Sequence, residues 1–213
     1  MVDGYLRQSP LAHLHLEARA TNDPTENEVG VEMGERQLLG MINLRAQKID
    51  PVLSPAITKV LGLELPTNVN TVSGRIDGIY TLCLGPDEWL IVTPSNKEQN
   101  LYNKLTQALE QLHTSINLVG ESRTVIRLSG LHARNVLAKG CSVDLHPRVF
   151  KPGQCAQTIL GRSDITVHQV AHEARTDAAT YDIIVFRSFA EYVWTWLEDA
   201  AREYGVRVVI HPS

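Results

Sequence analysis

Two histidines and two cysteines lie close together in the second half of this chain, and both residue types can carry chemistry. They are His132, Cys141, His146 and Cys155, in the stretch SGLHARNVLAKGCSVDLHPRVFKPGQC. A structural zinc site usually pairs two cysteines or two histidines across roughly two to five residues, because one tight turn must bring both ligands to the ion. Here each like pair is far wider, and a predicted helix over 130–139 separates His132 from the others. The spacing therefore disfavours a metal site.

A thiol active site is the second hypothesis for the same residues. A nucleophile pair of Cys141 or Cys155 with His146 needs the base within hydrogen-bond reach and a third group that orients it. The sequence leaves this pair open, but neither cysteine begins a predicted helix, where the helix dipole would lower the pKa of the thiol. Ser129 is not part of a Gly-x-Ser-x-Gly nucleophile motif, and we expect it to cap a helix. Cys141 then fits a small, buried apolar residue.

Several other function classes are disfavoured by composition and motifs. The glycines never form a Gly-x-Gly-x-x-Gly or phosphate-loop motif, so a nucleotide, FAD or NAD site of those types is not expected. The net charge is −4, and acidic and basic residues are well mixed, unlike the basic surface that nucleic-acid binding requires. No apolar run approaches the roughly 20 residues of a membrane span, and the N-terminus does not resemble a signal peptide. Three cysteines, an odd number, favour a reducing, cytoplasmic compartment.

The first half of the chain predicts one strand, a short helix, two strands and a long helix. Ser54 is a good N-cap for the short helix, and Gly62 is a typical end for it. Ser95 and Glu98 form a capping box at the start of the long helix, whose leucines recur every three to four residues. The predicted elements are residues 36–47, 54–62, 72–84, 87–93 and 95–113.

The second half repeats this order. Ser129 is predicted to cap a short helix that stops at Gly140, and Ser188 with Glu191 forms a second capping box. The polar stretch 172–180 predicts a hairpin loop. The predicted elements are strand 124–128, helix 129–140, strands 155–160, 164–170 and 181–186, helix 188–204 and strand 206–210.

Each half thus has the order of the split βαββαβ, ferredoxin-like unit. We predict an α+β fold of two ferredoxin-like halves, residues 36–120 and 121–213, packed as one compact domain. Residues 1–35 are predicted to be an N-terminal extension, and the polar segment 18–36 to be irregular. A single α+β sheet with insertions is the alternative architecture.

Two tryptophans in the last helix differ in their predicted positions. Trp196 fits the apolar stripe of this helix, whereas Trp194 lies roughly 200° away around the helix axis. A large aromatic residue off the core face indicates a second buried surface, typically a subunit contact. A helix sandwiched within its own domain would explain Trp194 equally well.

Several motifs in the chain resemble those of one family, the gamma subunit of heterotetrameric sarcosine oxidase. The most specific block lies within residues 122–165. Further matches are Ser9-Pro10-Leu11 near the N-terminus and Arg187-Ser188-Phe189 at the last helix. The motifs are LSGLHARNVLAKGC at 128–141, DLHP at 144–147, FKPGQCAQT at 150–158 and GPDEWL at 85–90.

The resemblance implies a fold similar to the folate-binding portion of glycine-cleavage aminomethyltransferase. It further implies a complex that demethylates sarcosine oxidatively to glycine, reduces oxygen to hydrogen peroxide and, with tetrahydrofolate as co-substrate, forms 5,10-methylenetetrahydrofolate. In such complexes FAD, FMN and NAD belong to the alpha and beta subunits and zinc to the delta subunit. The gamma subunit is not known to carry a catalytic residue, so the resemblance assigns this chain no catalytic, cofactor-binding or metal-binding residue.

The resemblance makes the alpha, beta and delta subunits the expected partners, and the Cys/His block a candidate contact with them. Two prolines restrict the segment DLHPRVFKPG, which presents His146, Arg148 and Phe150. We therefore predict a subunit interface formed by His146, Arg148, Phe150 and Trp194. The alternatives are a subunit of a related N-methyl amino-acid oxidase or dehydrogenase, and a folate-binding protein resembling aminomethyltransferase.

Overall fold

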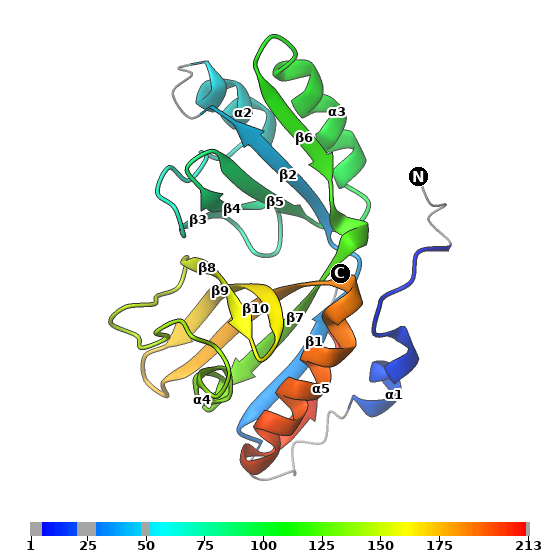
Figure 1. Cartoon of the computed structure of the whole chain (residues 1–213), viewed down its shortest axis with the longest axis vertical. Coiled ribbons are helices and arrows are strands. Elements are labelled where there is room, and N and C mark those ends of the chain that lie inside the picture. Colours follow the sequence, from blue (N-terminus) through cyan, green and yellow to red (C-terminus); the bar gives the residue numbers. More distant parts are fainter. Residues whose placement is uncertain (1–5, 21–28, 48–51, 212–213) are drawn as a thin grey trace. The chain divides into compact units, whose positions relative to one another are not determined.

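The computed structural model describes residues 6–20, 29–47 and 52–211. Contacts divide these residues into two compact units (Figure 1). Unit 1 combines the described parts of 1–38, 122–152 and 156–213, and unit 2 comprises those of 39–121 together with 153–155. Each unit consists of one sheet with helices packed against it.

Unit 2 has the ferredoxin-like strand order. Its sheet is β3-β4-β5-β2-β6, and every neighbouring pair is antiparallel. Helices α2 and α3 pack on each other, and their apolar faces share one core with β2, β4, β5 and β6. The elements are β2 (Gly40–Ala46), α2 (Leu53–Leu61), β3 (Val72–Gly74), β4 (Tyr80–Gly85), β5 (Glu88–Thr93), α3 (Glu98–Ala108) and β6 (Thr114–Leu118).

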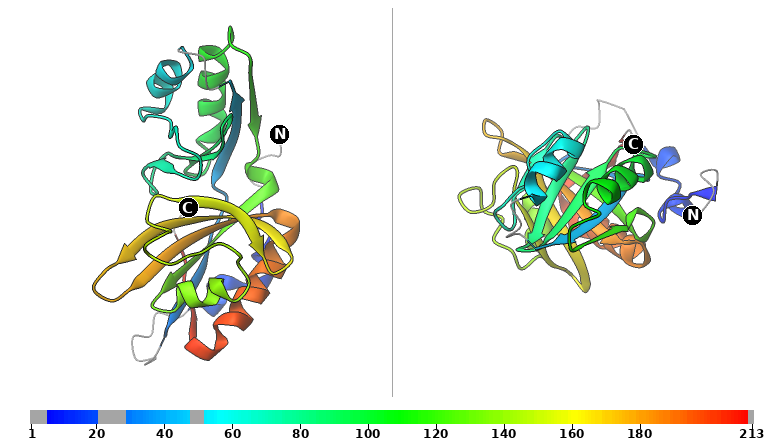
Figure 2. Two further views of the ribbon diagram at one scale, coloured as in Figure 1. Left: turned by 60° about the vertical axis from the view of Figure 1, so that its left-hand side comes forward. Right: turned by 90° about the horizontal axis from the view of Figure 1, so that it is seen from above.

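Unit 1 has a six-stranded sheet in the order β11-β1-β7-β10-β9-β8. Its helices α4 and α5 cover one face of this sheet (Figure 2). The strands are β1 (Val31–Arg36), β7 (Arg123–Gly130), β8 (Cys155–Leu160), β9 (Ser163–Glu173), β10 (Ala178–Phe186) and β11 (Val206–Val208). The helices are α1 (Leu16–Arg19), α4 (Ala133–Ala138) and α5 (Ala190–Ala201), and the 3₁₀ turns are η2 (Ala12–Leu14), η4 (Arg187–Phe189) and η5 (Arg202–Tyr204). A further 3₁₀ turn, η3 (Gly120–Ser122), begins in unit 2 and ends at Ser122 of unit 1.

The predicted α+β class and the repeated ferredoxin-like pattern are confirmed, but the prediction of an irregular segment is wrong for residues 31–36. These residues form β1, which lies parallel to β11 and antiparallel to β7. In the sheet, β1 therefore lies between β7 and β11, the first and last strands of the ferredoxin-like half formed by residues 122–211. Its alternating Val31 and Met33 are fully buried in the core, which shows why a polar segment can still pair as a strand. Residues 21–28 of the predicted segment lie outside the described residues.

The predicted serine caps are wrong, although the predicted helices exist. Across the described residues, none of helices α2, α3, α4 and α5 has a side-chain hydrogen bond from its N-cap residue. Ser129 instead belongs to β7, where it pairs with Glu32 of β1 and Thr180 of β10. Ser188 lies in the 3₁₀ turn η4 before α5. Pairing and tertiary packing shift these helix starts by a few residues, beyond what a local motif resolves.

A buried ion cluster joins three adjacent strands of unit 1. The carboxylate of Asp182 in β10 is fully buried, and it accepts hydrogen bonds from Arg127 Nε at 2.7 Å and Arg127 Nη2 at 2.9 Å in β7. It also accepts one from Arg36 Nη1 in β1 at 2.9 Å. His168 of β9 stands directly opposite Asp182 in the ladder and is itself buried. Burial lowers the pKa of His168 to about 4, although the charge of Asp182 acts in the opposite direction.

We predict that His168 makes stability depend on pH. The folded chain keeps His168 neutral down to about pH 4, whereas the unfolded chain protonates it near its ordinary pKa of about 6.5. The contribution of neutral His168 to the free energy of unfolding is therefore complete above pH 6.5 and is lost as the pH falls towards 4. Between pH 7.5 and pH 5 the free energy of unfolding should fall by about 2 kcal/mol from this group.

Urea unfolding at both pH values tests this prediction. His168→Gln should remove about 2 kcal/mol of the pH-dependent change, whatever its effect on stability at pH 7.5. His146→Gln, at an exposed histidine, is the matched control and should leave the change intact. An unaltered pH dependence in His168→Gln would contradict the assigned protonation state.

Candidate functional site

The loop of residues 144–150 is held at its two buried ends. Leu145 and Phe150 are 4% and 6% exposed, and both belong to the core of unit 1. Between them, His146 and Arg148 are exposed, and Val149 is 56% exposed. The loop therefore presents two polar side chains and one apolar side chain from a fixed base.

Local hydrogen bonds fix the backbone of this loop. The carboxylate of Asp144 accepts a hydrogen bond from the backbone N–H of His146 at 2.9 Å, an Asx turn that suits the following proline. The carbonyl of His146 accepts bonds from the N–H groups of Val149 and Phe150 at 2.8 and 2.9 Å. The imidazole Nδ1 of His146 accepts a further bond from the N–H of Arg148 at 3.2 Å. The motif DLHP thus encodes a preorganised turn.

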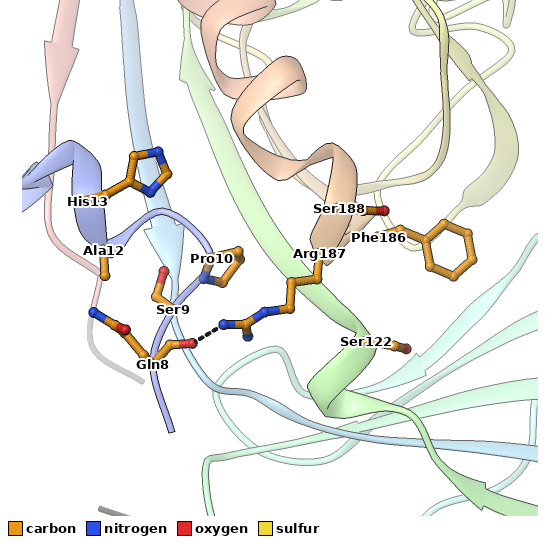
Figure 3. A pocket seen from close by; sticks show the side chains of 9 residues that line it. All are labelled: Gln8, Ser9, Pro10, Ala12, His13, Ser122, Phe186, Arg187 and Ser188. Carbon is orange, nitrogen blue, oxygen red and sulfur yellow. Dashed lines mark hydrogen bonds between the residues drawn. The ribbon is translucent and has the colours of Figure 1, made fainter. Parts of the chain in front are cut away.

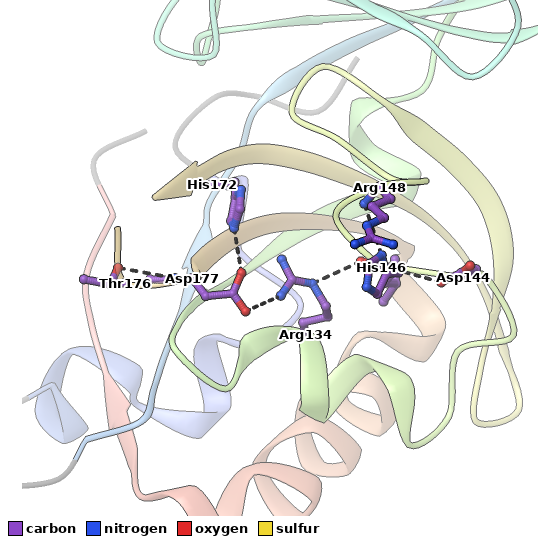
Figure 4. Close-up of polar contacts among 9 residues, drawn as sticks. Arg134, Asp144, His146, Arg148, His172, Thr176 and Asp177 are labelled. Atoms are coloured by element: carbon purple, nitrogen blue, oxygen red, sulfur yellow. Dashed lines mark hydrogen bonds and ion pairs between the residues drawn. The ribbon is translucent and has the colours of Figure 1, made fainter. Parts of the chain in front are cut away.

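Arg134 of α4 connects this loop to the β9–β10 hairpin (Figure 4). Its Nε donates to the carbonyl of Leu145 at 3.0 Å, and its Nη1 lies 3.0 Å from the carboxylate of Asp177. His172 Nε2 lies 2.8 Å from the other oxygen of Asp177. The pKa of Asp177 is lowered, first by its hydrogen bond with His172 and also by the charge of Arg134. One guanidinium therefore binds two surface segments, at Leu145 and Asp177, that are about thirty residues apart in the sequence.

The three cysteines occupy buried positions. Cys83, Cys141 and Cys155 are all thiols, between 0% and 8% exposed. Burial, with a smaller effect of Cys83, raises the pKa of Cys155 to about 12, so this thiol stays protonated and weakly nucleophilic at neutral pH. Within residues 6–20, 29–47 and 52–211, no group of three or more His, Cys, Asp and Glu side chains could hold a metal ion.

The structure places the four predicted interface residues differently. His146 and Arg148 are exposed on the loop, as an interface requires. Phe150 and Trp194 are instead buried in the core of unit 1, with Trp194 only 1% exposed, so neither presents a surface. The expectation that Trp194 lies off the core face is wrong.

The phase of helix α5 explains the error at Trp194. The buried residues of α5 are Ala190, Val193, Trp194, Leu197 and Ala201, whereas Trp196 is only half-buried. Residues 187–189 form a 3₁₀ turn, so the helical stripe does not begin at Phe189, which is 45% exposed. The apolar stripe is therefore rotated from the predicted one. The sequence reasoning also missed Arg134 and Asp177, because their contact joins segments with no common local pattern.

The family is decided by comparison with known proteins. The model of the sarcosine oxidase, gamma subunit family matches residues 45–203. The chain belongs to this family. It is 31% identical to sarcosine oxidase subunit gamma of Corynebacterium sp. (strain U-96), across 98% of this chain and 97% of the relative. Sarcosine oxidase subunit gamma of Arthrobacter sp. is also 31% identical, across 94% of this chain and 92% of the relative.

Solved structures agree with the family. A chain of heterotetrameric sarcosine oxidase from Corynebacterium sp. U-96, in complex with pyrrole 2-carboxylate, superposes with a TM-score of 0.82 at 30% identity. The match covers 96% of this chain and 99% of that chain. Glycine cleavage system aminomethyltransferase T from Bartonella henselae gives a TM-score of 0.68 at 14% identity, with 96% of this chain matching 59% of that one. This second likeness shows a shared fold.

We predict that Arg134 controls the order of both surface segments. Arg134→Ala removes its hydrogen bond to Leu145 and its ion pair with Asp177. Because the hydrogen bond from the largely buried Arg134 side chain to the Leu145 carbonyl is charge-assisted, amide hydrogen exchange in residues 144–150 should accelerate at least about tenfold. Exchange in residues 173–178 should accelerate less, since the ion pair with the exposed Asp177 is screened by solvent. Exchange in α5 should not change. Arg175→Ala, at an exposed arginine of the same hairpin, is the control, and equal acceleration in both variants would rule out the assigned role.

Proposed function

We propose that this chain is the non-catalytic gamma subunit of a heterotetrameric sarcosine oxidase. The observation that carries the proposal is the superposition on a chain of such a complex over nearly the full length of both chains. The buried thiols described above also favour a structural role. The isolated chain is then inactive, and it contributes to the enzyme a surface that binds the other subunits.

The chemistry of the proposed complex is that of its other subunits. The assembly would demethylate sarcosine to glycine while oxygen is reduced to hydrogen peroxide, and with tetrahydrofolate as co-substrate it would form 5,10-methylenetetrahydrofolate. FAD, FMN and NAD would be bound by the alpha and beta subunits, and zinc by the delta subunit. Among the described residues, no helix is long and apolar enough to cross a membrane. We place the complex in the cytoplasm because all three cysteines of this chain are thiols.

Co-expression tests the proposed subunit role. The tagged chain, produced with the other subunits of the same organism's sarcosine oxidase, should purify as a stoichiometric complex with a flavin absorption spectrum and sarcosine-dependent peroxide formation. The chain produced alone should form no peroxide. Turnover by the chain alone, or a failure to purify with any other subunit, would overturn the proposal. Tight binding of tetrahydrofolate to the isolated chain in calorimetry would instead favour a folate-binding protein.

The proposed contact with a partner subunit is the exposed part of the 144–150 loop. His146, Arg148 and Val149 stand on a backbone that is already ordered, so binding costs little conformational entropy. Phe150 anchors this loop, because its side chain is buried in the core of unit 1. Replacing Phe150 with alanine would cost about 3–5 kcal/mol of stability and would not report on the interface.

We predict that Arg148→Glu weakens assembly without unfolding the chain. Reversing an exposed charge at an interface opposes association and changes its salt dependence. The affinity for the partner subunits, measured by biolayer interferometry with the tagged chain, should fall at least about tenfold, with an unchanged Tm. Arg202→Glu makes the same charge change at an arginine whose side chain is 81% exposed near the end of α5, and should assemble normally. Equal affinities for both variants would exclude this loop from the interface.

A further inference from the structure

Two segments that carry the family resemblance meet at a second place in unit 1. Ser9 and Pro10 of the N-terminal segment, and Arg187 and Ser188 at the start of α5, line one surface cavity of about 710 Å³ (Figure 3). Phe186 and Ser122 also line it. These segments are more than 170 residues apart in the sequence. Neither belongs to the 144–150 loop, so the proposed interface does not account for them.

The cavity has a fixed positive charge. Arg187 Nη2 donates to the carbonyl of Gln8 at 2.7 Å, and this bond holds the guanidinium beside Ser9 and Pro10 (Figure 3). The guanidinium of Arg123 lies 5.0 Å from the ring centre of Phe186, so a second positive charge lies beside this aromatic residue of the cavity lining. A guanidinium presents its N–H groups in the geometry that a carboxylate accepts.

The acidic groups near the cavity are already bound. The carboxylate of Glu35 is buried and accepts hydrogen bonds from the hydroxyls of Ser9 and Thr124, while burial raises its pKa and the charge of Arg187 acts in the opposite direction. Glu191 Oε2 lies 3.3 Å from His13 Nε2. The hydroxyl of Ser188 is a further donor on the lining. A negatively charged group therefore suits this cavity.

Exposed aromatic residues follow the cavity-lining Phe186 closely in the sequence. Phe186 is 43% exposed, and Phe189 and Tyr192, at the start of α5, are 45% and 39% exposed. Aromatic and arginine side chains are enriched in protein interfaces, where they form the strongest contacts. Because Phe189 and Tyr192 are exposed but do not line the cavity, a chain segment could contact more of these aromatic residues than a small free carboxylate could.

We propose that this cavity receives a segment of a partner subunit that carries a carboxylate next to an apolar side chain. The carboxylate, from Asp, Glu or the C-terminus, lies against Arg187 and the hydroxyl of Ser188, and the apolar side chain lies against Phe186. This proposal rests on the proposed function, since its occupant belongs to the same assembly. The N-terminal segment and α5 then form a second contact, separate from the 144–150 loop.

Charge substitutions within the complete complex test the proposal. Ser188→Asp places a negative charge in the cavity and next to the N-terminus of α5, where a negative charge favours the helix, so the fold should be kept. The affinity for the partner subunits should fall at least about tenfold. Ser188→Asn, which has the shape of aspartate without its charge, should weaken assembly much less than Ser188→Asp does, and equal losses in the two variants would contradict the proposal.

Arg187 gives a second, independent comparison. Arg187→Glu should weaken assembly more strongly than Arg187→Lys, which keeps the positive charge. The control for the charge change is Arg202→Glu, at an exposed arginine that follows the far end of α5 and lies outside the cavity lining. If Ser188→Asp and Arg187→Glu assemble as well as the unchanged chain, the proposal is wrong while the subunit role stands. If the unchanged chain assembles with no other subunit, the proposed function itself fails.

Crosslinking identifies the occupant directly. A benzophenone amino acid at position 186 of the assembled complex should crosslink to a partner segment that contains a carboxylate next to an apolar residue. Crosslinking to a second copy of this chain, or to a basic segment, would overturn the proposal. Saturable binding of sodium benzoate to this cavity in the assembled complex at micromolar concentration would also overturn it, because a partner segment should already fill the cavity there.

Discussion

The buried carboxylate of Asp182 sets the arrangement on which unit 1 depends. It binds arginines from β1 and β7, so it joins three neighbouring strands at one point. A buried ion pair adds little net stability by itself, but leaving one of its charges unpaired is costly. A shift of β1 by one residue would turn Arg36 to the opposite face of the sheet, because side chains alternate along a strand. The cluster therefore specifies the register of β1.

The position of β1 determines where the N-terminal segment lies. Glu35, next to Arg36 on the opposite face, binds Ser9, and Leu11 and Leu16 fill the core of unit 1. Arg187 then binds the carbonyl of Gln8, which brings the N-terminal segment to the start of α5. A strand inserted into a ferredoxin-like sheet thus builds the cavity proposed as a subunit contact, and the same unit carries the 144–150 loop. Both proposed contacts are rigid surfaces fixed by packing and hydrogen bonds.

The histidines and cysteines that suggest chemistry have different roles in the fold. Cys141 and Cys155 are buried thiols, while His146 closes a turn with its backbone carbonyl and ring nitrogen. A sequence motif fixed by turn geometry and packing can look like an active site, because both use small polar residues at short intervals. In this family member the motif forms a turn that leaves Arg148 and Val149 exposed.

The sequence by itself determined the main helices and most strands in their order, since alternating and helical apolar patterns report directly on a buried face. It also determined the glycine end of α2 at Gly62, which has the positive φ that favours glycine, and the family through its motifs. Tertiary structure alone decided the place of β1, the helix starts at Ala133 and Ala190, and the burial of Trp194. Each of these depends on which distant strand or helix supplies the partner. A local pattern contains no information on that partner, and so Arg134 with Asp177, and Ser9 with Arg187, became visible only in the folded chain.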